Sequence, residues 1–69
     1  MNLWDKLKNI PFGAPLRVTL LDNSTLQGLY DTYTKALDND PEVASIDLKV
    51  GKDIYELCED EISSIQILI

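Results

Sequence analysis

The hydrophobic pattern of this chain has a period of two over most of its length, and this period constrains the fold most strongly. From residue 16 onward, apolar side chains alternate with polar ones in short runs, which is typical of strands that bury one face. No stretch between these runs has the pattern of a crossover helix, so consecutive strands are expected to pair antiparallel. The predicted strands span residues 16–21, 25–34, 44–50, 54–58 and 62–69.

Turn-forming residues separate the predicted strands. Asp22-Asn23-Ser24 has short polar side chains that bond their own backbone, and residues 38–42 form a loop by composition. Gly51-Lys52 has glycine in the first position, as a two-residue type II′ hairpin requires. Gly28 lies inside the second predicted strand, where glycine usually marks a bulge or a sharp bend. Antiparallel strands with a bend at this point favour a small barrel over an open sheet.

The first ten residues have helical spacing instead. Asn2 can cap a short helix over residues 2–10, and Asp5 lies in its favourable first turn. Pro11 ends this helix. One helical face carries the apolar residues Leu3, Trp4, Leu7 and Ile10. The expected fold is therefore mostly β, a single domain over residues 1–69. A short N-terminal helix precedes a five-stranded antiparallel, strongly bent barrel over residues 16–69.

Size and composition indicate an ordinary globular chain. Sixty-nine residues suit one domain with a small core, for which oligomerisation is a common supplement. The first residues lack the apolar stretch of a secretory signal, and no apolar run reaches the length of a membrane span. The single cysteine, Cys58, has no partner for an internal disulfide, which suits a reducing compartment. We therefore expect a cytoplasmic protein.

Charge is distributed unevenly along the chain. The net charge is −6, from twelve acids and six bases. Residues 1–17 carry three bases and one acid, whereas residues 38–61 carry nine acids and two bases. An acidic second half repels phosphate and attracts basic surfaces, so it favours a basic protein partner over nucleic acid.

Three segments carry a resemblance to a known family. The run Leu16-Arg17-Val18-Thr19-Leu20-Leu21-Asp22-Asn23 combines strand alternation with a polar turn, and Leu26-Gln27-Gly28 adds a glycine at the bend. Residues 55–65 pass from an apolar strand through a short acidic turn into Ile62-Ser63-Ser64-Ile65. This pattern resembles the Sm-like proteins, in which a helix caps a five-stranded, SH3-like barrel. Another SH3-like barrel and an OB-fold are the alternatives.

The resemblance implies RNA binding on the inner rim of a ring, but several rim positions depart from the family pattern. Cys58-Glu59 stands in place of an Arg-Gly pair, and Glu61 replaces an asparagine. In the loop at residues 38–42, where the family holds a base with aromatic and asparagine side chains, only Asn39 matches. An acidic rim reverses the phosphate attraction that supplies much of the affinity for nucleic acid. Ordinary Sm-type RNA binding is therefore disfavoured.

An acidic subset of the fold suits the charge better. The chain is similar in size, charge sign and strand pattern to the Rof type, small acidic Sm-like inhibitors of the transcription terminator Rho. We therefore expect a non-enzymatic binding or adaptor module whose acidic surface contacts a basic protein, such as one that binds nucleic acid. The expected partner-binding residues are Asp38, Asp40, Glu42, Glu56, Glu59, Asp60 and Glu61. For the last three, a solvated turn that protects the next strand from aggregation is the competing interpretation.

Two other functions stay open at this stage. An RNA-binding Sm-like ring would use the basic N-terminal segment together with tyrosines on one face. Its expected contacts are Lys6, Lys8, Arg17 and Asn39. The other is a regulatory or structural subunit whose only role is assembly. Trp4 fits a lid over the core, or a docking anchor if its ring is exposed.

Catalysis and metal binding are not expected. The chain has no histidine, and the acidic neighbours of Cys58 should raise the pKa of its thiol. Residues 38–42 offer carboxylates but lack the glycine and the closing glutamate of an EF-hand loop. We therefore assign no catalytic residue, no cofactor and no metal ligand.

The C-terminal strand suggests how copies of the chain could meet. Residues 65–69 place isoleucines at alternate positions and contain no lysine or proline that would protect a sheet edge. In Sm-like rings, the fifth strand pairs with the fourth strand of the next subunit. The resemblance therefore implies a homo-oligomer, with a seam at Ile54, Leu57, Ile65, Ile67 and Leu68.

Overall fold

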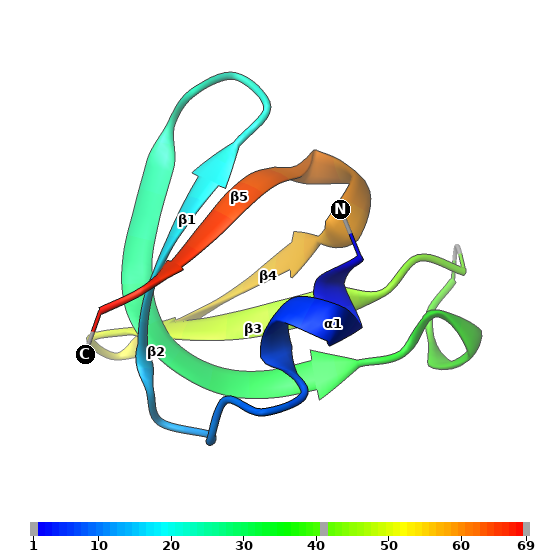
Figure 1. Ribbon diagram of the computed structural model, residues 1–69, viewed down its shortest axis with the longest axis horizontal. Coiled ribbons are helices and arrows are strands. Elements are labelled where there is room, and N and C mark those ends of the chain that lie inside the picture. Colours follow the sequence, from blue (N-terminus) through cyan, green and yellow to red (C-terminus); the bar gives the residue numbers. More distant parts are fainter. Residues whose placement is uncertain (1, 41, 69) are drawn as a thin grey trace.

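The computed structural model describes residues 2–40 and 42–68, and there the chain forms one short helix followed by five strands (Figure 1). The elements are α1 (Leu3–Leu7), β1 (Pro15–Leu20), β2 (Thr25–Thr34), η1 (Ala36–Asp38), β3 (Ser45–Val50), β4 (Asp53–Cys58), η2 (Glu59–Glu61) and β5 (Ile62–Ile67), where η denotes a 3-10 turn. The predicted helix, the five strands and their antiparallel pairing are confirmed. The predicted end of the last strand, at residue 69, lies outside the described residues.

The helix α1 is shorter than predicted, because it ends at Leu7 and the chain turns before the proline at residue 11. Asn2 caps it as expected, since the Asp5 backbone N–H donates to Asn2 Oδ1 at 3.2 Å. Leu3 and Leu7 are fully buried and attach α1 to the core. In the described part of the chain, no helix has the length and apolar character needed to cross a membrane.

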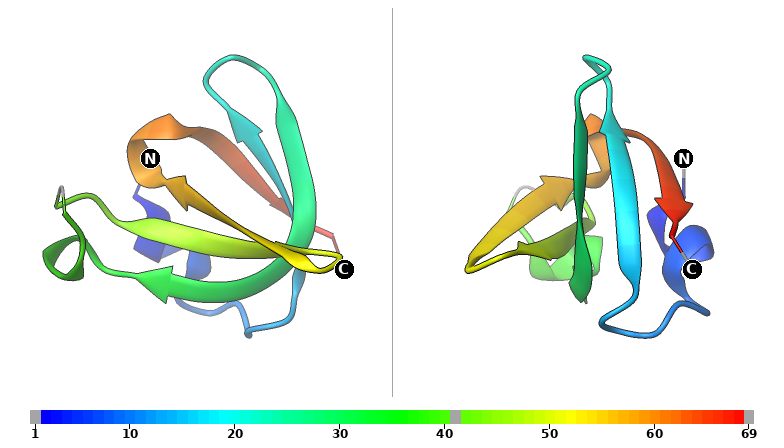
Figure 2. Two further views of the ribbon diagram at one scale, coloured as in Figure 1. Left: turned by 180° about the vertical axis from the view of Figure 1, so that it is seen from behind. Right: turned by 90° about the vertical axis from the view of Figure 1, so that its left-hand side faces the viewer.

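The strands form one antiparallel sheet in the order β4-β3-β2-β1-β5. Within residues 2–40 and 42–68, no ladder joins β4 to β5, so the predicted closure into a barrel is not formed. The reason is geometric: β4 and β5 meet at η2 and then diverge on either side of β1 and β2 (Figure 2, right). The sheet is nevertheless strongly curved, and α1 covers part of its concave side (Figure 1).

The long strand β2 carries much of this curvature (Figure 1). A bulge or bend was expected at Gly28, but the register shift lies between Tyr30 and Thr32, at Asp31. Gly28 meets a different requirement, because a Cβ atom there would lie 2.7 Å from the Lys49 carbonyl oxygen. Glycine therefore lets β3 approach β2 closely where the sheet turns.

The core lies on the concave side of the sheet. It consists of Leu3, Leu7, Leu16, Val18, Tyr30, Ala44, Ile46, Leu48, Leu57, Ile62 and Ile65. The predicted alternation of β3 is confirmed at Ile46 and Leu48, which are fully buried, and at the exposed Lys49. Ser45 departs from the pattern, because this polar side chain is also fully buried.

Both predicted hairpin turns are present. In the β1–β2 turn, Asn23 has φ +70°, and Asp22 Oδ1 accepts the Ser24 backbone N–H at 3.0 Å. In the β3–β4 turn, Gly51 has φ +62°, as the first position of a type II′ hairpin requires. Local turn chemistry therefore sets these two connections.

Candidate functional site

Two connections meet at one end of the sheet and form a groove lined by acids. Its lining comes from the β2–β3 connection and from η2 with the start of β5, and Leu21 of the β1–β2 turn completes it. The groove has a volume of about 480 Å³. Its lining residues are Leu21, Ala36, Glu42, Val43, Ala44, Glu59, Asp60 and Ile62. We call it the acidic groove.

Leu21 is the most exposed apolar residue of this groove, with 68% of its surface accessible. A smaller hollow of about 250 Å³ shares Leu21 and Asp60 and adds Asp22 and Glu61. The Leu21 backbone N–H donates to the Glu61 carbonyl oxygen at 3.0 Å, which holds the β1–β2 hairpin against η2. An exposed leucine is therefore flanked by carboxylates from three separate segments of the chain.

Hydrogen bonds on both sides fix the position of η2. The Cys58 backbone N–H donates to Glu61 Oε1 at 3.3 Å, so the Glu61 carboxylate caps the turn from within. The Glu59 backbone N–H donates to the Ala44 carbonyl oxygen at 2.8 Å, which ties η2 to the residue before β3. Glu61 thus has a structural role in addition to its charge.

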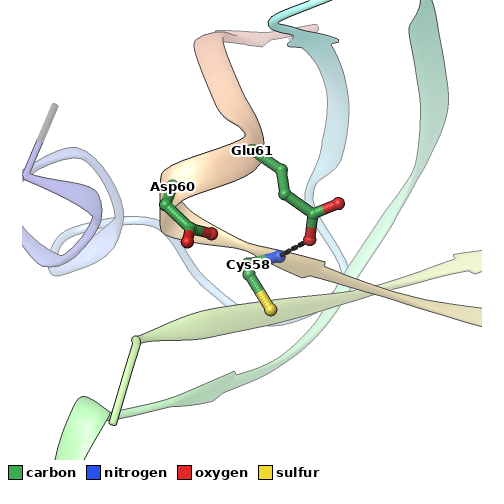
Figure 3. A group of neighbouring side chains, drawn as sticks. All are labelled: Cys58, Asp60 and Glu61. Atoms are coloured by element: carbon green, nitrogen blue, oxygen red, sulfur yellow. Dashed lines mark hydrogen bonds between the residues drawn. The ribbon is translucent and has the colours of Figure 1, made fainter. Parts of the chain in front are cut away.

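Cys58, Asp60 and Glu61 lie together at this turn (Figure 3). The cysteine sulfur and one carboxylate oxygen of each acid lie within 4.8 Å of one another, so these groups could contact a cation. Burial raises the pKa of the Cys58 thiol, and its hydrogen bond with Glu61 raises it further. The sequence predicted this direction from the acidic neighbours, but burial is the larger cause. The thiol form has little of the nucleophilicity of a thiolate.

A buried polar network organises the β2–β3 connection. The Asn39 side-chain amide donates to the Val43 carbonyl oxygen at 2.7 Å and to Ser45 Oγ at 3.0 Å. The Ser45 hydroxyl in turn donates to Glu56 Oε2 at 3.1 Å. Both amide hydrogens of Asn39, an expected RNA contact, are therefore used inside the protein. Sequence analysis missed Ser45, because its place in the alternation indicated an exposed side chain.

A second acidic cluster lies on the outer face of the sheet. Asp47 and Glu56 are directly opposite each other on β3 and β4, and Asp31 lies at the bulge of β2. Burial raises the pKa of Asp47, and the charges of Glu56 and then Asp31 raise it further. Sequence analysis did not find this cluster, because it depends on the register of three strands.

The expected partner-binding acids do not form one patch. Glu42, Glu59 and Asp60 line the acidic groove, and Glu61 lines the adjoining hollow. The other three lie elsewhere: Asp38 lines a groove beside Trp4, Asp40 is exposed on the connection, and Glu56 binds Ser45. The structure therefore brings together the η2 triplet and one acid of the β2–β3 connection.

The cations of the RNA alternative have separate neighbours. The Lys8 ammonium lies 3.8 Å from the Asp5 carboxylate, and Lys6 lies beside the serines of β5. The Arg17 guanidinium donates to Gln66 Oε1 at 3.2 Å and to Gln27 Oε1 at 3.3 Å. These bonds hold the Arg17 side chain on the outer face of β1, where Gln27 on β2 and Gln66 on β5 are its cross-strand partners.

The expected seam residues fall into two groups. Leu57 and Ile65 are buried in the core of the same chain. Ile54 is 51% exposed on β4, whereas Ile67 and Leu68 are partly buried at the end of β5. Ile54, Ile67 and Leu68 lie on or beside the edge strands β4 and β5, where a further strand could pair.

The acidic groove is thus assembled from the β1–β2 turn, the β2–β3 connection and η2, and its character is carboxylate and apolar. Comparisons with protein-family models, with curated proteins and with solved structures found no match to this chain.

Proposed function

We propose that this chain is a non-enzymatic binding or adaptor module that holds a basic segment of a partner protein in the acidic groove. The observation that carries the proposal is the exposed Leu21, flanked by carboxylates from three separate segments. A partner that presents basic side chains around an apolar one would be complementary to this surface.

The charges and the leucine contribute to binding in different ways. A net charge of −6 attracts a basic partner over a distance of about 10 Å at moderate salt, which raises the association rate. Apolar contact with Leu21 is insensitive to this screening and slows dissociation once the two surfaces meet. The acids therefore raise the association rate, and the leucine lowers the dissociation rate.

The partner that we propose is itself a nucleic-acid-binding protein. Such proteins present clustered lysine and arginine side chains for phosphate, and an acidic surface can occupy the same cations. Binding in the acidic groove would then compete with nucleic acid and regulate the partner.

We interpret the fold as an open variant of the Sm-like barrel. Support comes from the short helix followed by five antiparallel strands and from the long, curved second strand. The close approach of β3 at Gly28 gives the bend of this strand a physical cause.

We also propose that copies of the chain associate by strand addition, with β5 of one copy against β4 of the next. Among the described residues, β4 and β5 are the outer strands of the sheet and each pairs on one side only, and Ile54 on β4 is half-exposed. Light scattering at micromolar concentration should show particles larger than a monomer. Ile54→Lys should shift them toward monomers, whereas a strict monomer in the unaltered protein would contradict this association.

A peptide titration tests the acidic groove directly. A labelled lysine–glycine repeat peptide should bind at low salt, and the double variant Glu59→Gln with Asp60→Asn should weaken this binding roughly fivefold to tenfold. Fluorescence anisotropy of the peptide measures both affinities. The difference between the two proteins should shrink as salt is raised, because screening reduces the charge contribution.

A charge-matched control separates the groove from the net charge. Asp31→Asn with Asp53→Asn removes two charges from the exposed side chains of β2 and β4, away from the groove lining. This control should weaken peptide binding less than the groove variant does. Equal weakening by both variants, or tighter binding to RNA than to the peptide at low salt, would refute a dedicated acidic groove.

A further inference from the structure

A second groove lies on the other side of the β2–β3 connection and is lined mainly by aromatic rings. It has a volume of about 520 Å³ and is lined by Trp4, Tyr33, Lys35 and Asp38. The two ring centroids lie 5.1 Å apart with an interplanar angle of 41°, and 48% of the Trp4 surface is exposed. We call it the aromatic groove. Trp4 is therefore exposed enough to contact a partner, as the docking-anchor interpretation requires.

The aromatic groove and the acidic groove are neighbours. Lys35 lines the first, and the next residue in the chain, Ala36, lines the second. Burial raises the pKa of Tyr33, and the negative charge of Glu59 raises it further. Glu59 lines the acidic groove, so its field reaches the tyrosine of the aromatic groove. One extended partner could occupy both.

The lining combines two aromatic faces with a carboxylate, which is the chemistry that recognises a planar cation. Guanidinium groups stack on aromatic rings and form paired hydrogen bonds with carboxylates. We propose that the aromatic groove takes an arginine side chain of the basic partner segment, with the guanidinium over Trp4 and Tyr33 and directed to Asp38. This inference rests on the proposed function, because the acidic groove would hold the neighbouring part of the same segment.

Lys35 does not block this mode of binding. Its ammonium lies 4.0 Å from the Asp38 carboxylate, and the two side chains are 68% and 61% exposed. Exposed pairs of this kind contribute little to stability, so a guanidinium can replace the lysine at the carboxylate. Removal of Lys35 should therefore strengthen arginine binding.

A nucleobase is the other planar group that stacks on aromatic rings, but the charges oppose it. Asp38 lines the groove and Glu59 acts on Tyr33, so a phosphate beside the stacked base would meet two carboxylates. Lys35 is the cation of this lining, and it already lies near Asp38. The charge distribution therefore favours arginine over a nucleotide.

Two labelled peptides of equal length and charge test the inference, one an arginine–glycine repeat and the other a lysine–glycine repeat. The arginine peptide should bind roughly threefold to tenfold more tightly, since stacking adds to the charge attraction. Trp4→Leu should abolish this preference, and it should weaken binding of the lysine peptide less than binding of the arginine peptide. Asp38→Asn should reduce the preference, and Lys35→Ala should increase it.

Phe12→Leu is the matched control, because Phe12 forms a similar ring pair with Tyr30, at 5.0 Å, outside the aromatic groove. It should leave the arginine preference intact. Trp4 is the only tryptophan, so its fluorescence should change when the arginine peptide binds.

Three outcomes would overturn the inference. Equal affinity for the two peptides, with no effect of Trp4→Leu, would refute the arginine site but not the proposed binding in the acidic groove. Failure of both peptides to bind would refute the proposed function as well. A mononucleotide that quenches Trp4 fluorescence while the arginine peptide leaves it unchanged would assign the aromatic groove to nucleic acid.

Discussion

The two ends of the curved sheet differ in what constrains their residues. Near the β3–β4 turn, Gly28 faces the Lys49 carbonyl oxygen at a distance that excludes any side chain. At the other end, Leu21, Glu59 and Asp60 line open grooves. Backbone packing constrains Gly28, whereas the grooves at the second end leave room for charge and an exposed leucine. Substitution of Gly28 should therefore change stability, and substitution of the exposed groove residues should change binding.

Gly28→Ala should have the largest effect on stability. The new methyl group would meet backbone at 2.7 Å and Val50 Cγ2 at 2.9 Å, so the strands must separate. We expect a loss of about 1–3 kcal/mol in the free energy of unfolding, measured by urea denaturation. Gly13→Ala is the comparison for backbone strain without a clash, because Gly13 has φ +92°, which an L side chain adopts only with strain, and nothing lies within 4 Å of the added atom. A loss of less than about 0.5 kcal/mol at Gly28 would show that close approach does not limit this position.

Ser45→Ala should have the next largest effect, because it removes a buried hydroxyl from between two polar partners. Asn39 loses an acceptor and Glu56 loses a donor. We expect a loss of about 1–2 kcal/mol in the free energy of unfolding, measured by urea denaturation. Ser63→Ala, at an exposed position of β5, should stay within about 0.5 kcal/mol of the unaltered protein. Equal effects of the two changes would mean that the network does not stabilise the connection.

Asp47→Asn should have the smallest effect, and its sign should be opposite. Removing one of two facing carboxylates should raise the free energy of unfolding at neutral pH by up to about 1 kcal/mol. The folded state raises the pKa of Asp47, so the contribution of this group is most favourable below its unfolded pKa and is lost as pH rises through the folded value.

The pH dependence provides the check on Asp47. The stability advantage of Asp47→Asn should grow as pH rises through the folded pKa of Asp47 and disappear at low pH, where the carboxyl group is protonated in the unaltered protein. Urea denaturation at a series of pH values measures this difference. Asp53→Asn, at the exposed start of β4 and outside the Asp47–Glu56 pair, removes the same charge and is the control. A constant advantage of Asp47→Asn at every pH would contradict charge repulsion as its cause.

Local chemistry made much of the fold predictable from the sequence. The Asn2 cap, the Asn23 turn and the Gly51 hairpin each depend on residues within a few positions of one another. The strands were recognisable because their alternation repeats over short runs. The prediction of a closed barrel was wrong, because closure does not depend on local chemistry. It depends on the directions in which β4 and β5 leave η2, which determine whether these two edge strands pair.

The candidate site was harder to predict, because it joins residues that are distant in the chain. The η2 triplet was recognisable as an acidic cluster, but Leu21 looked like an ordinary residue at a strand end. Its exposure beside Glu42 and Asp60 depends on how the hairpin packs against η2. Ser45 and Asp47 were equally hidden, because burial and register are properties of the assembled sheet.

The anchoring of η2 has a consequence for the binding that we propose in the acidic groove. Its backbone is tied to the β1–β2 hairpin through Leu21 and to the start of β3 through Ala44. These tethers hold the backbone that carries the carboxylates, so the proposed docking would cost little backbone entropy. Under the proposed function, rigid docking of this kind would select partners by shape as well as by charge. A basic chain with the wrong spacing would gain nothing from rearrangement of the groove.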